Sequence, residues 1–239
     1  MPDTGDYVPV GPFSFVLRRA TPRHLPELRG LIEEAAEWLR AHKDTDQWSR
    51  PWPDLDASVG RMQDDLRKRK TWLVWDGDIA AGTITIDRHE TLAAHRRPVW
   101  PESKRHEPAL YVRRVIVSRR YAGIGLGAGL LDWAADFAKR NYGVTLIRVD
   151  VWTTNLELHR YYERQGFTPC RGRDVAELAG YPSQALFERG VDRAGSDYTD
   201  LFTEEDSPRK RRPRPGKRGG ITSPRRPPAL RAAPEGVAP

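Results

Sequence analysis

The sequence holds a single cysteine, Cys170, among its 239 residues. One cysteine excludes a disulfide within the chain and argues against a zinc site built from thiolates, so we expect no metal. No apolar run approaches the roughly 20 residues that a membrane-spanning helix needs. The N-terminus, MPDTGDYVPVGPFSF, lacks both the positive charge and the apolar centre of a signal peptide. These absences predict a soluble, cytoplasmic protein that does not enter a membrane.

The last part of the chain is short of acids and of large apolar side chains. Residues 207–239 hold ten Lys and Arg, eight prolines and one acid, Glu235. Such a segment cannot bury enough apolar surface to offset the entropy that ordering costs. We therefore expect a flexible N-terminus over residues 1–12, one folded domain over 13–195, and a linker with a disordered Arg/Pro-rich tail over 196–239.

The tail also accounts for the basic charge of the chain. Without residues 207–239, 30 Lys and Arg face 32 Asp and Glu, and the net charge changes from +7 to −2. A nucleic-acid-binding fold is expected to carry its basic patch on the folded surface, so the composition argues against one. Two interpretations of the tail stay open: a solvated extension, or a segment that binds a weak anionic partner such as a nucleic acid.

The spacing of apolar residues predicts a mixed α/β (α+β) domain. We expect strands over 13–19, 71–75, 79–87, 110–117, 145–152, 167–171 and 184–189, with a hairpin turn at 76–78. Helices are expected after Thr21-Pro22, which supplies an N-cap and a proline for the first helical position, around residues 59–66, after the glycines at 123–127, and from Asn155.

The most informative segment is 115–128, VIVSRRYAGIGLGA, in which a predicted strand enters a glycine-rich turn that opens a helix. Glycines let a ligand approach the backbone closely, and the unpaired N–H groups at a helix start bind anions. Arg120 adds a positive charge at the edge of the turn. The pattern favours a diphosphate ligand, although a flexible turn without any ligand is also compatible with it.

The same glycines allow a second interpretation. Gly123-x-Gly125-x-x-Ala128 satisfies the dinucleotide-binding fingerprint, and Asp150 follows near the end of the next predicted strand. This would indicate a Rossmann-type protein. However, no further strand–helix–strand unit follows that could complete a doubly wound sheet, so we disfavour it.

Two motifs together resemble the GNAT superfamily of N-acetyltransferases. Arg120-Tyr-Ala-Gly123-Ile-Gly125 matches the family's coenzyme A signature, (Gln/Arg)-x-x-Gly-x-(Gly/Ala) between a strand and a helix. The family's second signature is an Asn that opens a helix ending in Tyr-x-x-x-Gly-Phe, and residues 155–167 are similar to it. The resemblance implies a mostly antiparallel central sheet flanked by helices. It also implies acetyl transfer from acetyl-CoA to an amine by direct attack in a ternary complex.

The resemblance also assigns roles to single residues. Backbone groups of Val115 and Val117 would pair with the pantetheine arm of the cofactor like an added strand, and an N–H near Val117 would stabilise the oxyanion. Asn155 would contact the cofactor. Tyr162 would protonate the departing thiolate, with its neighbour Tyr161 as the aromatic that packs. The pyrophosphate would be bound by the amides of Gly123, Ile124, Gly125, Gly127 and Ala128, beside Arg120.

The general base stays open. Some family members carry a glutamate on the strand before the phosphate turn, but this chain has Tyr111-Val-Arg113-Arg114 there. His106, Glu107 or Asp150 could act through water, or the amine could arrive deprotonated.

The acceptor and the partners stay open too. Trp38, Trp48 and Trp52 are predicted near the first helix–loop–helix, which overhangs the acceptor site in this family. They could bind a cationic amine, or they could pack in the core and seal the domain. The loop 88–108, rich in His and Arg, suits an anionic substrate instead. A small-molecule or peptide amine, a homodimer and a catalytically silent acyl-CoA-sensing module all remain compatible with the sequence.

Overall fold

The computed structural model describes residues 14–89, 100–170, 183–192 and 198–205. All of them fall within one compact unit, which ends at Ser207. The predicted extension over 1–12, the tail from 206 and the middle of the 88–108 loop lie outside the described residues. Among the residues that are described, no helix is both long and apolar enough to cross a membrane.

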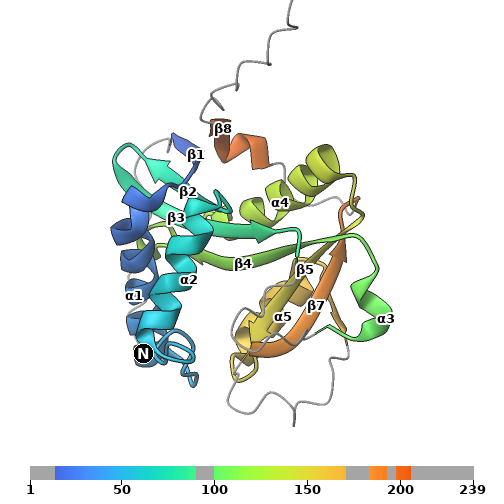
Figure 1. Ribbon diagram of the computed structural model, residues 1–239. Helices are drawn as coiled ribbons and strands as arrows, with labels where there is room; N and C mark the ends of the chain where they lie inside the picture. The colour runs from blue at the N-terminus through green and yellow to red at the C-terminus, as the bar shows by residue number, and fades with distance from the viewer. Residues whose placement is uncertain (1–13, 90–99, 171–182, 193–197, 206–239) are drawn as a thin grey trace, which may run out of the picture. The chain divides into compact units, whose positions relative to one another are not determined.

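In this part of the chain eight strands form one sheet, in the order β6-β7-β5-β4-β3-β2-β1-β8 (Figure 1). The pairs β4–β5 and β1–β8 are parallel, and the other pairs are antiparallel. The strands are β1 Phe15–Arg19, β2 Thr71–Asp76, β3 Ile79–Asp87, β4 Ala109–Val117, β5 Leu146–Trp152, β6 Thr168–Cys170, β7 Ser183–Gly190 and β8 Phe202–Glu205. The predicted mixed α/β domain with a mostly antiparallel sheet is therefore confirmed. A doubly wound dinucleotide fold is wrong, because β4, which enters the glycine turn, lies antiparallel to β3.

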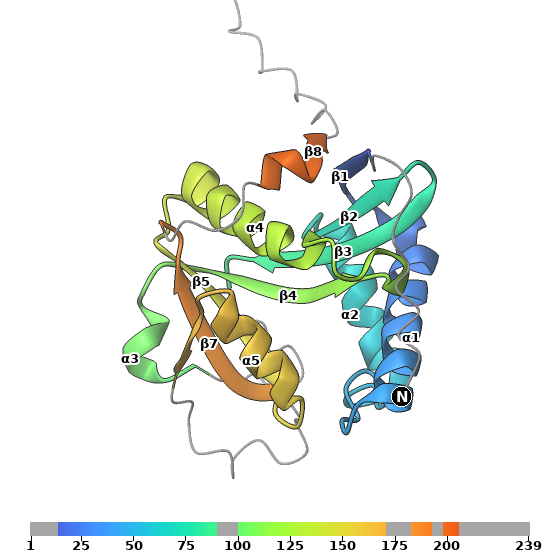
Figure 2. The ribbon, with the colours of Figure 1, turned by 180° about the vertical axis from the view of Figure 1, so that it is seen from behind.

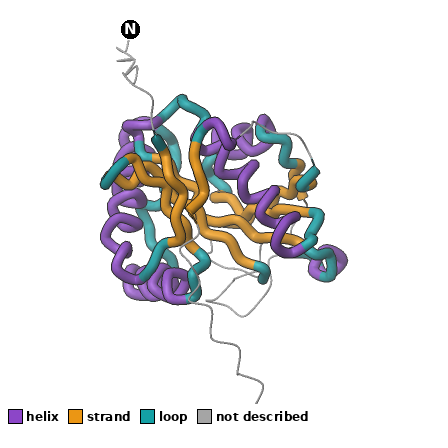
Figure 3. Tube along the Cα trace, turned by 90° about the horizontal axis from the view of Figure 1, so that it is seen from above, coloured by secondary structure: helices purple, strands orange, loops and turns teal. Residues whose placement is uncertain are grey.

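Helices cover both faces of the sheet. α1 (Leu25–His42) and α2 (Leu55–Arg67) pack on one face, whereas α4 (Leu126–Tyr142) and α5 (Leu156–Arg164) pack on the other (Figures 1 and 2). Seen from above, the strands lie between these two groups (Figure 3). A short helix, α3 (Glu102–Arg105), interrupts the segment that was predicted as loop.

The start of α1 differs from the prediction. Thr21-Pro22 begins a 3-10 turn over Pro22–His24, and the α-helix itself begins at Leu25. The turn has a capping box, in which the backbone N–H of Thr21 donates to Nδ1 of His24 at 3.0 Å. The capping signal was therefore genuine, but it opens a tighter turn that precedes the helix.

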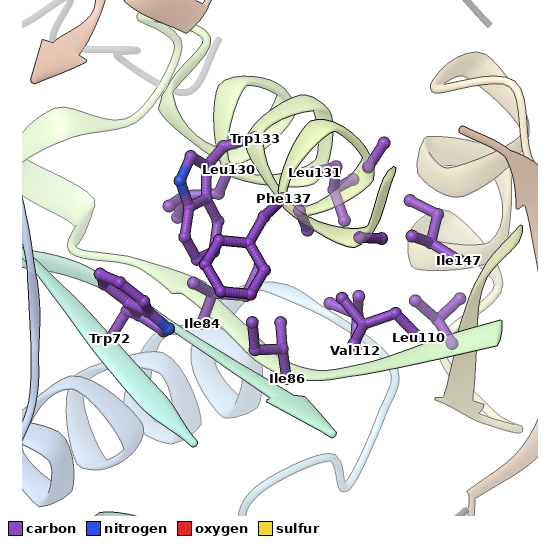
Figure 4. Packing of buried hydrophobic residues seen from close by; sticks show 14 of the residues in the cluster. Trp72, Ile84, Ile86, Leu110, Val112, Leu130, Leu131, Trp133, Phe137 and Ile147 are labelled. Carbon is purple, nitrogen blue, oxygen red and sulfur yellow. The ribbon is translucent and has the colours of Figure 1, made fainter. Parts of the chain in front are cut away.

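The side chains of β2 contribute to two hydrophobic cores, one on each face of the sheet. Because side chains alternate along a strand, Trp72 and Val74 pack against α4, whereas Leu73 packs against α1 and α2. Trp72 meets Trp133 edge-on, with 4.9 Å between ring centroids, and Phe137 at 5.7 Å (Figure 4). The larger core thus rests on an aromatic cluster, which fixes α4 and with it the turn that opens α4.

β8 corrects the predicted domain boundary at residue 195. The strand Phe202–Glu205 pairs in parallel with β1, and Phe202 is buried in the larger core. A Cβ at Gly129 of α4 would lie only 2.6 Å from Leu201, so this glycine lets the segment before β8 approach α4 closely. The folded domain therefore extends at least to Glu205.

Candidate active site

β4 and β5 separate at their C-terminal ends. They pair in parallel only over residues 109–112 and 146–149, although β4 continues to Val117 and β5 to Trp152. Figure 2 shows β4 crossing the view while β5 and β7 run steeply beside α5. Beyond Val112, the edge of β4 that faces β5 has no strand partner in the described part of the chain.

A β-bulge explains the separation. Between the pairs Thr85↔Arg113 and Thr83↔Ile116, β3 contributes one residue and β4 contributes two, Arg114 and Val115. Arg114 has φ +49, in the left-handed region that few side chains adopt. Because a bulge bends and twists its strand, the second half of β4 turns away from β5.

A cavity of about 460 Å³ lies at this opening. Its lining includes Met62, which packs on the α2 face of the sheet, and Tyr162, which packs on the α5 face. The cavity therefore passes between β4 and β5 from one face to the other. On β5, Val149 and Val151 belong to the larger core, so the alternation turns Asp150 to the opposite face, where it lines the cavity.

The predicted phosphate turn follows β4, after a 3-10 turn over Arg119–Tyr121. The six consecutive N–H groups from Gly123 to Ala128 donate to no acceptor among the described residues, and the first bond of α4 joins Gly129 N–H to the Gly125 carbonyl at 2.9 Å. Gly123 and Gly125 both have φ +85, and apart from their chain neighbours no atom of the described residues lies within 4 Å of where their Cβ would be. Arg120 is exposed beside them. Free donors, open space and a helix N-terminus together fit a diphosphate.

Other residues of this segment contribute to packing. Val115, Val117 and Ile124 are all partly buried against the larger core, and Val115 also lines the cavity. A Cβ at Gly127 would lie 2.9 Å from the hydroxyl of Tyr161, so this glycine lets α5 approach α4.

Tyr162 lines the cavity and is also a packing residue. It is 7% exposed and meets Phe167 edge-on, with 5.3 Å between centroids. Both tyrosines pack, Tyr161 toward α4, as expected, and Tyr162 toward Phe167 and Phe187, so the alternative packing role of Tyr162 is also present. Burial raises the pKa of Tyr162 above its ordinary value of 10.0, so the phenol stays protonated at neutral pH.

The side chain of Asn155 forms structural hydrogen bonds that were not predicted from the sequence. Its Oδ1 accepts from the Leu158 N–H at 3.0 Å, which caps α5, and its Nδ2 donates to Oε1 of Gln47 at 2.6 Å. Both side chains are buried. The predicted cofactor contact of Asn155 stays a prediction, and its amide already joins α5 to the loop after α1.

The loop after α1 is tied to the β5–α5 corner by further bonds. The indole N–H of Trp152 donates to Oδ1 of Asp46 at 2.7 Å and lowers the pKa of that carboxyl. The hydroxyls of Thr45 and Thr154 lie 3.0 Å apart. These contacts hold the loop beside the cavity.

Of the three tryptophans predicted near the acceptor site, two line the cavity and one does not. Trp48 and Trp52 line the cavity. Trp38 is neither there nor in the buried core: its ring stacks on His42 at 5.2 Å and lies 3.9 Å from the guanidinium carbon of Arg119.

The structure separates the three base candidates. Glu107 forms an ion pair with the fully buried Arg148, and His106 lies exposed at the end of α3 outside the cavity lining. Asp150 alone of the three lines the cavity.

Sequence reasoning missed Asp65 of α2, whose carboxylate binds Arg113 at 3.1 Å and Arg114 at 2.6 Å. An acid in a short polar helix resembles a surface residue, and only burial distinguishes Asp65 from its neighbour Asp64.

Comparisons with known proteins agree with this geometry. The model of the acetyltransferase (GNAT) family matches residues 30–167. The uncharacterized N-acetyltransferase YesJ of Bacillus subtilis (strain 168) is 30% identical over 172 residues, which cover 69% of this chain and 83% of that protein.

Solved structures agree at the level of the fold. A GNAT acetyltransferase from Listeria monocytogenes 4b F2365 has a TM-score of 0.58 at 23% identity, over 77% of this chain and 98% of its own. The PaiA N-acetyltransferase of Thermoplasma acidophilum, in complex with coenzyme A, has a TM-score of 0.50 at 15% identity, over 74% of this chain and 99% of its own. With the family match over more than half of its length, the chain belongs to the GNAT family of acetyltransferases.

Proposed function

We propose that this chain transfers the acetyl group of acetyl-CoA to a small-molecule or peptide amine, by direct attack within a ternary complex. The observation that carries the proposal is continuity along one segment of the chain. β4 borders the cavity over its middle residues, and the turn that follows it leads to the N–H groups over 123–128, which have no acceptor among the described residues. A reaction cavity and a phosphate site that follow each other along the chain suit a long cofactor with a diphosphate at one end and a thioester at the other. The relative from Thermoplasma acidophilum, solved with coenzyme A, supports this choice of cofactor.

The residues present fit that cofactor. The amides from Gly123 to Ala128 would bind the pyrophosphate, with Arg120 beside them. Backbone groups of Val115 and Val117 would hold the pantetheine arm, since the edge of β4 that faces β5 has no strand partner there among the described residues. When bound, acetyl-CoA supplies an activated acetyl group as a thioester.

Tyr162 is the proposed general acid. As the amine attacks the thioester and the carbon–sulfur bond breaks, the phenolic proton of Tyr162 would pass to the departing sulfur, and the proton that the nitrogen loses on forming the amide would return to the phenolate through water. The raised pKa of Tyr162 keeps that proton in place until it is needed.

Asp150 is the proposed base. It lines the cavity from β5, whereas Glu107 is engaged with Arg148 and His106 lies outside the lining. Asp150 would accept the proton of the attacking ammonium through a water molecule, because the amine must be neutral to attack.

A coenzyme A-release assay against a panel of amines tests the proposal, with calorimetry of acetyl-CoA binding in parallel. We expect binding in the micromolar range and thiol release that depends on both enzyme and amine. Binding without release from any amine would favour an acyl-CoA-sensing module. Absence of binding would remove the cofactor assignment altogether.

A further inference from the structure

The bulge in β4 places two consecutive arginines on one wall of the cavity. In a regular strand, neighbouring side chains point to opposite faces. Here Nη2 of Arg113 and Nη1 of Arg114 both reach the Asp65 carboxylate, at 3.1 and 2.6 Å, and both arginines line the cavity. The left-handed backbone of Arg114 makes this possible.

The cluster around this pair carries more positive than negative charge. Asp87 pairs with Lys70 and lies 3.6 Å from Arg113. Lys70, Arg113 and Arg114 thus face the two carboxylates of Asp65 and Asp87, and none of these five side chains is more than 25% exposed. An excess charge held away from water is costly, and an entering anion would offset that cost.

Arg113 also has unused hydrogen-bonding capacity. Its Nε–H is buried and has no acceptor among the residues that the structure describes. Burial, and next the neighbouring charge of Arg113, lower the pKa of Arg114, which is the direction expected where one carboxylate must serve two guanidinium groups. A planar guanidinium with a free N–H is suited to a carboxylate or phosphate oxygen.

We propose that the acceptor amine also carries an anionic group, a carboxylate or a phosphate-like group, which Arg113 and Arg114 bind. The indoles of Trp48 and Trp52, which line the same cavity, would contact the apolar body of this acceptor. The inference rests on the proposed acetyl transfer and adds the substrate class.

Three matched amines test the inference: L-phenylalanine, its phosphonate analogue, and L-phenylalaninol, in which a neutral hydroxymethyl group replaces the carboxylate. We expect kcat/KM to be at least about tenfold higher for one or both anionic amines than for phenylalaninol, the usual worth of one charge-assisted hydrogen bond. The two anionic amines distinguish a carboxylate site from a phosphate site. Equal or better use of phenylalaninol would overturn the inference.

Variants show whether this selectivity depends on the arginine pair. Arg113→Gln is chosen because Arg114 still pairs with Asp65, and Lys70 still pairs with Asp87. It should lower the ratio of kcat/KM values, anionic over neutral, by about 10- to 100-fold, and Arg113→Lys should restore part of the ratio. Arg67→Gln, an exposed arginine of α2, is the control and should leave the ratio unchanged. An unchanged ratio in a folded Arg113→Gln protein would contradict the proposal.

A binding experiment without turnover separates this inference from the proposed function. Phenylacetate and phenylphosphonate are titrated by calorimetry into the protein with coenzyme A present, and benzyl alcohol serves as the neutral probe. Binding of an anion that Arg113→Gln weakens, without acetyl transfer to any amine, would keep the anion site and refute the proposed enzyme. Acetyl transfer without any anion binding would do the reverse.

Discussion

The two parts of the site are built in different ways. The phosphate turn is local: its donors are six consecutive backbone N–H groups, and its shape depends on two glycines with positive φ. The proposed acceptor cavity draws its lining from α1 and the loop after it, α2, Trp100, β4, β5, α5 and Ser183 of β7, and its chemistry depends on side chains. A turn made of backbone can serve any member of a family that uses the same cofactor. A cavity made of distant side chains can be specific to one chain.

The largest expected effect comes from breaking the turn. Gly125→Val should weaken acetyl-CoA binding by at least about 100-fold, because a branched side chain at φ +85 strains the backbone and occupies space that the pyrophosphate needs. Calorimetry measures the affinity. Gly77→Val is the matched control, since Gly77 also has positive φ (+58) and open space but lies in the β2–β3 hairpin. It should cost a similar amount of stability and leave affinity unchanged. Normal affinity in Gly125→Val would refute the phosphate assignment.

The next largest effect is expected when the carboxylate of Asp65, which binds the two arginines of the cavity lining, is removed. Asp65→Ala should destabilise the protein by about 3–5 kcal/mol, because it removes the carboxylate that pairs with the largely buried Arg114 and leaves Arg113 only its 3.6 Å pair with Asp87. Asp64→Ala changes the neighbouring acid, whose ion pairs are exposed, and should cost less than about 1 kcal/mol. Urea denaturation measures both free energies of unfolding. Similar losses in the two variants would show that Asp65 is no more than a surface acid.

The third prediction concerns the hydroxyl of Tyr162, which lines the cavity. Tyr162→Phe should lower kcat by about 100-fold, with a much smaller change in KM for acetyl-CoA. Its pKa is raised above 10, so the acid form is lost only as pH rises beyond that value, and kcat should show no basic limb from this group below pH 10. Tyr161→Phe is the control, because Tyr161 is not among the cavity-lining residues. Equal turnover in Tyr162→Phe and wild type would remove Tyr162 from catalysis.

The smallest expected effect comes from removing the Arg/Pro-rich tail. Deletion of residues 207–239 should leave the melting temperature and acetyl-CoA affinity nearly unchanged, although the net charge falls from +7 to −2. Deletion from residue 198 also removes β8 and should cost at least about 2 kcal/mol, since Phe202 is buried and Glu204 accepts from the Trp133 indole at 3.0 Å. Thermal melts of both truncations check the domain boundary. An equally early melt in the shorter deletion would contradict the predicted independence of the tail.

The sequence predicted most of the element order, because strands and helices follow from spacings within a few residues. It predicted the glycine turn that opens α4 for the same reason, since glycines before a helix act through their own backbone. It placed the end of the domain too early, because β8 has four residues and owes its place to pairing with β1 at the other end of the described chain. Periodicity carries no information about such a partner.

What the sequence determined by itself is therefore the chemistry of the local segments: a helix start with free donors, a tyrosine on the next helix, and apolar faces that require a sheet between helices. Tertiary structure decided which side chains share the cavity. Nothing in the local sequence pattern predicts the bulge that turns Arg113 and Arg114 to one face. No residue spacing predicts the contacts of Gln47 with Asn155 or of Asp65 with the two arginines. These contacts join residues far apart in the chain, and their geometry exists only when the core has packed and β4 has separated from β5.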